Sequence, residues 1–318
     1  MKRLTILFTL IIPFLFSSTW GFFAHRKINY LAIFTLPSEM ISFYKKNNKY
    51  IAEHAVDPDK RRYIDTLEAP RHYLDVENYE VNIDSIPEKY ADALAKYGHQ
   101  KLNENGIVPW QIQRSYYSLV SAFKSHDSLK ILKYSAELGH YIGDAHVPLH
   151  TTHNHNGQLT NQHGIHAFWE SRIPELFAKD YNFLVGSATY IESPLKSAWQ
   201  MVKHAHQLLD SVLVLEAKLN MKFPSDQKYS YTERNNIILK QYSIAYSKAY
   251  QDQMNGMVEK QMRAAILSTG SFWFSAWVDA GQPTLKNLIK VSPDLSEKKY
   301  SEQIDQKFRD GKIIGREN

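Results

Sequence analysis

Histidine is concentrated in one short stretch of the chain. Seven of the 14 histidines lie between His140 and His166, in the sequence GHYIGDAHVPLHTTHNHNGQLTNQHGIHAFWESR. His140 precedes Asp144 by four residues, and His166 precedes Glu170 by the same interval. On a helix, residues four apart lie on one face, so each pair offers an imidazole and a carboxylate to a common ligand. These two ligand types suit zinc.

His150 lies between the two pairs. Pro148 is expected to end the first helix and to place His150 in the turn beyond it. Gly139 and Gly143 would let another backbone or an ion approach that helix closely. The whole pattern predicts a metal site, and the alternative is an exposed polar loop or a loose surface metal patch. The remaining histidines of the stretch lack a paired carboxylate and are expected to be solvated or to support the ligands: His146, His153, His155 and His163.

Upstream, the segments HAVDPDKRRY and APRHYLDVENY contribute Asp57 and His72, fifteen residues apart. Spacing alone makes them only candidate ligands, because Asp-Pro more often marks a turn. The chain has no cysteine, which excludes disulfides, thiolate metal sites and cysteine nucleophiles. Any metal must therefore be held by His, Asp, Glu or backbone groups.

Helical periodicity dominates the segments that must position these residues. With 43% apolar and 22% charged residues, the chain is not a disordered or low-complexity sequence. No run of alternating strand residues and no repeat is found, so we predict an all-α fold. It would be a single mainly helical domain over residues 20–290, with the metal cluster at the base of a cleft. Helices are expected after His25, over 127–145 with Asp127 as cap, after Ser193-Pro194, and in a long segment from near Glu233; the aromatics Phe272, Trp273, Phe274 and Trp277 are expected in the core.

The first nineteen residues have the pattern of a signal peptide. Lys2 and Arg3 precede the apolar run 4–16, and small residues follow. The run is too short for a comfortable membrane span, although an uncleaved anchor is the alternative. Cleavage before Trp20 would export the protein to a periplasmic or extracellular compartment, without a stable membrane span. It would also reduce the net charge from +5 to +3, because two cations are removed.

Two further segments are expected to be irregular. Residues 151–163, TTHNHNGQLTNQH, are polar and rich in Gly and Asn, which is typical of a loop. Residues 291–318 are expected to form a charged C-terminal tail, since 11 of the 22 residues from 297 onward are charged.

Four blocks of the sequence, taken together, resemble a known superfamily. WGFFAH, D-P-D…R-H-Y-L-D, G-H-Y-I-G-D-x-H-x-P-L-H and H-x-F-W-E occur in the order found in the superfamily that unites zinc-dependent phospholipase C with the three-zinc, single-strand-specific nucleases. The resemblance covers Trp20 to Glu170 and implies three zinc ions. It assigns one ion to Asp57, His72, His140 and a bridging Asp144; the second to His150, His166 and Glu170; and the third to His25, Asp144 and the amino nitrogen and carbonyl oxygen of Trp20.

The resemblance gives signal cleavage a chemical purpose. An amine that is locked in a peptide bond has no lone pair to donate, so Trp20 can bind zinc through its amino group only after cleavage. The implied reaction is phosphodiester hydrolysis by metal-activated hydroxide. Asp57 is the carboxylate expected to orient or deprotonate the attacking water.

The two branches of the superfamily differ in details that this sequence mixes. Ala24 and the spacing from Trp20 to His25 are similar to the nucleases. Glu170 and the short interval from His150 are similar to the phospholipases, as is Asp57-Pro58-Asp59. We therefore expect a phospholipase C-like hydrolase of phospholipid or another phosphodiester. The alternatives are a single-strand-specific zinc endonuclease and a non-catalytic helical zinc-binding protein.

Two residues are candidates for substrate binding. Tyr73 follows His72 directly and could stack on an unpaired base, contact a lipid headgroup or simply pack in the interior. Lys60 belongs to a basic run that could bind phosphate. The alternative for that run is a solvated basic turn.

Overall fold

The protein is mainly helical, as predicted, in the computed structural model, which describes residues 21–234, 237–286, 288 and 295–311. The expected signal peptide, Trp20 and parts of the expected C-terminal tail (291–294 and 312–318) lie outside the described residues. Within the described part, no helix is both long enough and apolar enough to cross a bilayer.

The elements follow one another along the chain, with longer irregular connections at 152–164 and 178–193. The α-helices are α1 (Phe22–Ala32), α2 (Ser38–Lys46), α3 (Asn48–Glu53), α4 (Asp57–Arg61), α5 (Val76–Tyr79), α6 (Tyr90–Asn105), α7 (Val108–Lys124), α8 (Ser128–Asp144), α9 (Ile165–Ala167), α10 (Ile173–Phe177), α11 (Pro194–Lys222), α12 (Ile244–Gln253), α13 (Met257–Asp279) and α14 (Leu295–Asp310). The strands are β1 (Tyr229–Arg234) and β2 (Ile237–Tyr242). Shorter turns that matter for the site are η2 (His54–Val56), η3 (Ala69–His72), η5 (Pro148–Thr151) and the π-helical η6 (Phe168–Arg172).

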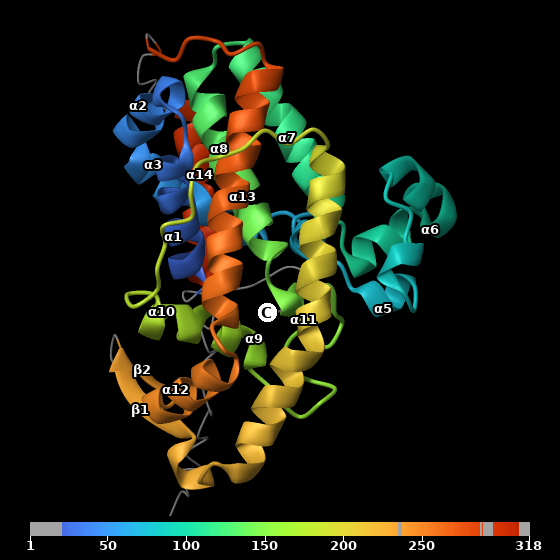
Figure 1. The fold of residues 1–318 in the computed structure, drawn as a ribbon, viewed down its shortest axis with the longest axis vertical. Helices are drawn as coiled ribbons and strands as arrows, with labels where there is room; N and C mark the ends of the chain where they lie inside the picture. Colours follow the sequence, from blue (N-terminus) through green and yellow to red (C-terminus); the bar gives the residue numbers. More distant parts are fainter. Residues whose placement is uncertain (1–20, 235–236, 287, 289–294, 312–318) are drawn as a thin grey trace, which may run out of the picture.

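Long helices build the body of the molecule. α7, α8, α11 and α13 run roughly side by side, and α1 packs against both α8 and α13 (Figure 1). The predicted aromatic core lies on α13, where Phe272, Trp273 and Trp277 are buried and Phe274 is partly buried. Burial of such large apolar side chains is the main source of stability in a fold of this type.

Local signals define the ends of the helix that carries the first His/Asp pair. The side chain of Asp127 accepts a hydrogen bond from the backbone N–H of Lys130 at 3.0 Å and caps α8, as predicted. α8 ends at Asp144, and Pro148 opens the separate turn η5. His150 therefore lies in the turn beyond the helix, where the sequence places it.

The expected long helix from near Glu233 is wrong in its first part. Residues 229–242 form an antiparallel hairpin in which Tyr229 pairs with Tyr242, and α12 begins only at Ile244. The helix starts there because Ser243 caps it, accepting from the backbone N–H of Tyr246. Tyr and Ile favour strands, and the ring of Tyr242 stacks on Phe168 at 3.8 Å, so the hairpin supports the π-helical turn η6.

Two glycines of α8 allow α1 to approach it closely. A Cβ added at Gly139 would lie 2.0 Å from Asn29 Oδ1, and one at Gly143 would lie 2.9 Å from His25 Nδ1. The Asn29 amide donates a hydrogen bond to the Ala136 carbonyl at 2.9 Å, which joins the two helices in the interior. The prediction that these glycines admit a close neighbour is confirmed, and the neighbour is the α1 helix.

Candidate metal centre

One buried carboxylate, Asp144 at the end of α8, lies among four imidazoles. Its Oδ2 atom is 3.0 Å from His72 Nδ1 and 3.2 Å from His140 Nε2. Its Oδ1 atom is 3.4 Å from His25 Nε2 and 3.6 Å from His150 Nδ1. These residues come from α1, η3, α8 and η5, so the fold brings far-apart stretches of the chain together at this point.

A second group of donors lies around Glu170. His150 Nε2 is 2.8 Å from His166 Nε2 and 3.3 Å from Glu170 Oε2, while His166 Nε2 is 2.8 Å from the same oxygen. His25 Nε2 lies 3.3 Å from Glu170 Oε1 and joins this group to Asp144. The predicted His166/Glu170 pair thus shares one face of the α9–η6 helical turn.

Backbone carbonyls orient two of the imidazoles. His140 Nδ1 donates to the Ala55 carbonyl at 2.8 Å, and His150 Nδ1 donates to the His72 carbonyl at 2.9 Å. Each ring therefore keeps its Nε2 lone pair free and directed at the centre. A tautomer fixed in this way is the usual arrangement of a histidine that binds a metal.

The distances between donor atoms fit zinc. Four ligands at about 2.0 Å from a tetrahedral zinc lie about 3.3 Å from one another. The donors fall into three compact groups: His25, His140 and Asp144; Asp59, His72 and His140; and His150, His166 and Glu170. Nitrogens that face each other at 2.8–3.0 Å, as His150 does His166 and His140 does His72, are typical of lone pairs that converge on a cation.

The structure places Asp59, and not Asp57, beside the upstream histidine. Asp59 Oδ1 is 3.7 Å from His72 Nδ1 and 3.8 Å from His140 Nε2. The carboxylate of Asp57 instead lies 2.6 Å from His54 Nδ1, outside the three donor groups. Residues two apart on a helix point about 200° away from each other, so only one of the two acids on α4 can face the centre.

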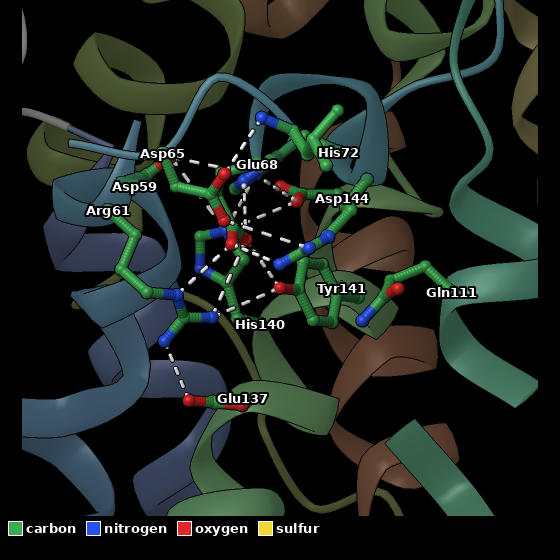
Figure 2. A network of polar contacts seen from close by, with 12 residues as sticks. Asp59, Arg61, Asp65, Glu68, His72, Gln111, Glu137, His140, Tyr141 and Asp144 are labelled. Carbon is green, nitrogen blue, oxygen red and sulfur yellow. Dashed lines mark hydrogen bonds and ion pairs between the residues drawn. The ribbon is translucent and has the colours of Figure 1, made fainter. Parts of the chain in front are cut away.

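A buried network behind His72 holds that ring in place (Figure 2). Glu68, fully buried, has Oε1 3.4 Å from His72 Nε2 and accepts from the Tyr141 hydroxyl at 2.5 Å. Arg61 and Arg71 donate to its other oxygen at 3.1 and 2.6 Å. Burial would raise the pKa of Glu68, but the contact with His72 and the two guanidinium groups lower it. Glu68 was not among the residues expected from the sequence, although it precedes His72 by four residues, the same spacing as in the His140/Asp144 and His166/Glu170 pairs.

The carboxylates of the centre raise the pKa of His25 and depend on the histidines for their own charge. Burial alone would lower the pKa of His25, but its hydrogen bond to Glu170 and the charges of Asp144 and Asp59 raise it to about 9. Burial lowers the pKa of His140, which already donates to a carbonyl. Burial would raise the pKa of Asp144 and Glu170, yet the surrounding histidines keep both well below the usual range. The site is therefore built to hold positive charge.

The two predicted substrate-binding residues have partners within the protein. Tyr73 is 7% exposed and packs against Gly106, and its hydroxyl donates to the Glu104 carbonyl at 3.4 Å. This geometry fits the packing alternative for Tyr73. Lys60 Nζ lies 2.8 Å from Asp305 Oδ1 on α14 and 3.8 Å from Asp57 Oδ1.

Comparisons with known proteins agree with this centre. The sequence profile of a family described as S1/P1 nuclease matches residues 20–267. This is a family of zinc-dependent phosphodiester hydrolases within the superfamily named from the sequence, and the match favours the nuclease alternative over the phospholipase C-like interpretation. No individual curated protein matches the chain significantly.

Asp59→Asn and Asp57→Asn form a matched pair of tests. We expect Asp59→Asn to weaken binding of one zinc ion at least about 10-fold, because it removes a charged donor from the centre. Asp57→Asn should leave zinc affinity within about twofold. Competition with a chromophoric chelator measures both. A greater loss of zinc affinity in Asp57→Asn than in Asp59→Asn would show that Asp57, and not Asp59, is the zinc ligand.

Stability of the metal-free protein should depend on pH through His25. Its folded pKa of about 9 exceeds the usual 6.5, so protonated His25 stabilises the folded chain fully below about pH 6.5. That contribution, up to about 3 kcal/mol, is lost as the pH rises through 9. Urea unfolding with chelator present, at pH 6 and pH 9.5, should show a larger loss of stability in the wild type than in His25→Gln, where only other groups such as His72 still contribute. An equal loss in both proteins would contradict it.

Proposed function

Since the chain belongs to the S1/P1 nuclease family, we propose that it hydrolyses phosphodiester bonds in single-stranded nucleic acid with the aid of three zinc ions. The observation that supports the proposal is the presence of three neighbouring donor groups: two of them share His140, and the third approaches Asp144 through His150. A sequence pI of about 9.0 suits a polyanionic substrate, although this alone would also suit other anions.

The residues divide among the ions as follows in this proposal. Asp59 takes the place first assigned to Asp57, and the two oxygens of Asp144 face different histidines, so this carboxylate could serve two ions. The first ion would be held by Asp59, His72, His140 and Asp144, the second by His150, His166 and Glu170, and the third by His25, Asp144 and the amino end of Trp20. Zinc bound there supplies hydroxide at neutral pH and neutralises the charge of the phosphodiester.

Asp59 is the best-placed residue to handle a proton. Its side chain is 19% exposed, compared with 2% for Asp144 and 12% for Glu170, so among these three carboxylates it is the most open to solvent. We therefore assign Asp59 to orient the attacking water and accept its proton. His72 and His140 lie near enough to fix the position of this carboxylate, and Glu68 fixes His72 from behind.

The start of the described chain supports the role of the amino terminus. A Cβ placed on Gly21 would lie 3.4 Å from Glu170 Oε1, so the residue after Trp20 lies beside the metal centre. His25, on the first turns of α1, reaches Asp144 and Glu170. Signal cleavage before Trp20, and with it export, would free the amine that the third site requires.

Two extra residues before Trp20 should therefore remove one zinc ion per chain, because the amine that binds it becomes an amide. Metal analysis of protein that begins at Trp20 and of the extended form tests this. The same dipeptide added after Asn318 serves as the control for a change in chain length. Equal zinc content in all three proteins would exclude the amino terminus as a ligand.

The substrate is tested with zinc-loaded protein on three phosphodiesters. We expect an oligodeoxynucleotide to be cleaved at least about 10-fold faster as a single strand than as a duplex, and phosphatidylcholine vesicles to release no phosphocholine. His140→Ala should abolish cleavage, since two donor groups share this ring. Release of phosphocholine without cleavage of DNA would instead support the phospholipase C-like interpretation. A zinc-loaded protein inactive on all three would support the non-catalytic alternative.

A further inference from the structure

The C-terminal helix α14 (Leu295–Asp310) lies beyond the residues that the family profile matches, which end at 267. Its composition predicts a solvated tail, yet Ile304 is 5% exposed and the helix packs against α4. Figure 1 draws it in red, on the side of the molecule where α1 and α3 lie. The described part of the tail is thus a docked helix.

Phe308 connects α14 to the beginning of α1. Its ring centroid lies 5.4 Å from that of Phe22 and 5.2 Å from that of Tyr63, which it meets edge to face. Phe22 is the first residue of α1, two residues after Trp20 and three before His25. One aromatic side chain therefore contacts both the segment that carries His25 and the segment that follows α4.

An ion pair makes a second connection, next to a proposed zinc ligand. Asp305 Oδ1 lies 2.8 Å from Lys60 Nζ, and the Lys60 side chain is only 17% exposed. Lys60 directly follows Asp59 on α4. This ion pair therefore holds the turn of α4 that carries Asp59, whose side chain faces the metal centre.

A pocket of about 340 Å³ lies between α14 and the helices α3, α4 and α8. Its lining includes His54, Arg61 and Lys133 and, on α14, Tyr300 and Asp305. Asp305 and Phe308, on the second half of α14, make the contacts that reach the ligand-bearing segments.

The beginning of α1 needs such support. The residue before it, Gly21, has no side chain that could cap the helix, and the first turn of any helix leaves backbone N–H groups without helical partners. After processing, the chain would begin one residue earlier, and chain ends fray unless they are tied down. A metal ligand at a chain end therefore requires neighbours that hold it.

We propose that α14 is a clasp that joins the start of α1 to α4 and so positions His25 and Asp59 around the zinc ions. The inference rests on the proposed metal centre. Phe308 and Asp305 act as positioning residues, since neither belongs to the three donor groups. The clasp slows the loss of zinc from the sites that use His25 and Asp59.

Zinc release from full-length Phe308→Ala tests the clasp. With excess chelator, we expect one zinc ion per chain to leave about 10-fold faster than from the wild type, with the other ions released at the wild-type rate. Lys307→Ala, at an exposed neighbouring position of α14, is the matched control and should behave as the wild type. Wild-type release from Phe308→Ala overturns the proposal, even if its melting temperature falls, because the role would then be structural only.

A charge-reversal series covers the case in which Phe308→Ala does not fold. Asp305→Lys places two cations together and should speed release of the ion assigned to Asp59, and Lys60→Glu with Asp305→Lys should restore slow release. No change in the single variant, or no restoration in the double variant, overturns the proposal. The metal content of the wild type separates the two hypotheses: a wild type without a zinc cluster refutes the proposed function, whereas a loaded wild type with insensitive variants refutes only the clasp.

Discussion

The contact between the Asp144 carboxylate and its surrounding imidazoles is the interaction on which the centre depends. A buried carboxylate is costly unless positive charge compensates it. Here the compensation comes from His140 on the same helix and from histidines on α1, η3 and η5, which keep the pKa of Asp144 well below its usual range. The close approach of α1 at Gly143 and the end of α8 at Asp144 both serve this arrangement. Protons and zinc therefore compete for one pool of negative charge.

Much of the site could be predicted because its signals are local. The His140/Asp144 and His166/Glu170 pairs follow from helical periodicity, and Pro148 places His150 by ending the helix. The caps at Asp127 and Ser193 were predictable for the same reason, since each satisfies backbone N–H groups within three residues.

What could not be predicted depends on the direction in which a helix presents its side chains. Asp57 and Asp59 lie on opposite sides of the short helix α4, and which side faces the centre is set by packing against distant segments. The hairpin at 229–242 was missed because Tyr242 is stabilised by Phe168, more than seventy residues earlier. The docking of α14 was missed because a mostly charged helix needs only Ile304 and Phe308 to find a partner surface.

The metal ligands say little about the substrate, because both branches of the superfamily would use the same donor chemistry. Residues around the centre must make that distinction, and the two candidates from the sequence already have internal partners. Tyr73 is packed against Gly106, and Lys60 is paired with Asp305. Specificity is therefore to be sought in the surface that surrounds the centre.

The backbone carbonyls that accept hydrogen bonds from His140 and His150 limit how the centre can change as the sequence evolves. A carbonyl oxygen is present whatever residue occupies position 55 or 72, so point substitutions at position 55 leave the proton on the same ring nitrogen of His140. His72 lacks this protection, because its outer nitrogen faces the side chain of Glu68. A single substitution of Glu68 can thus change the protonation of His72 during evolution. The protonation of His140 and His150 changes only if the backbone carbonyls that they contact move.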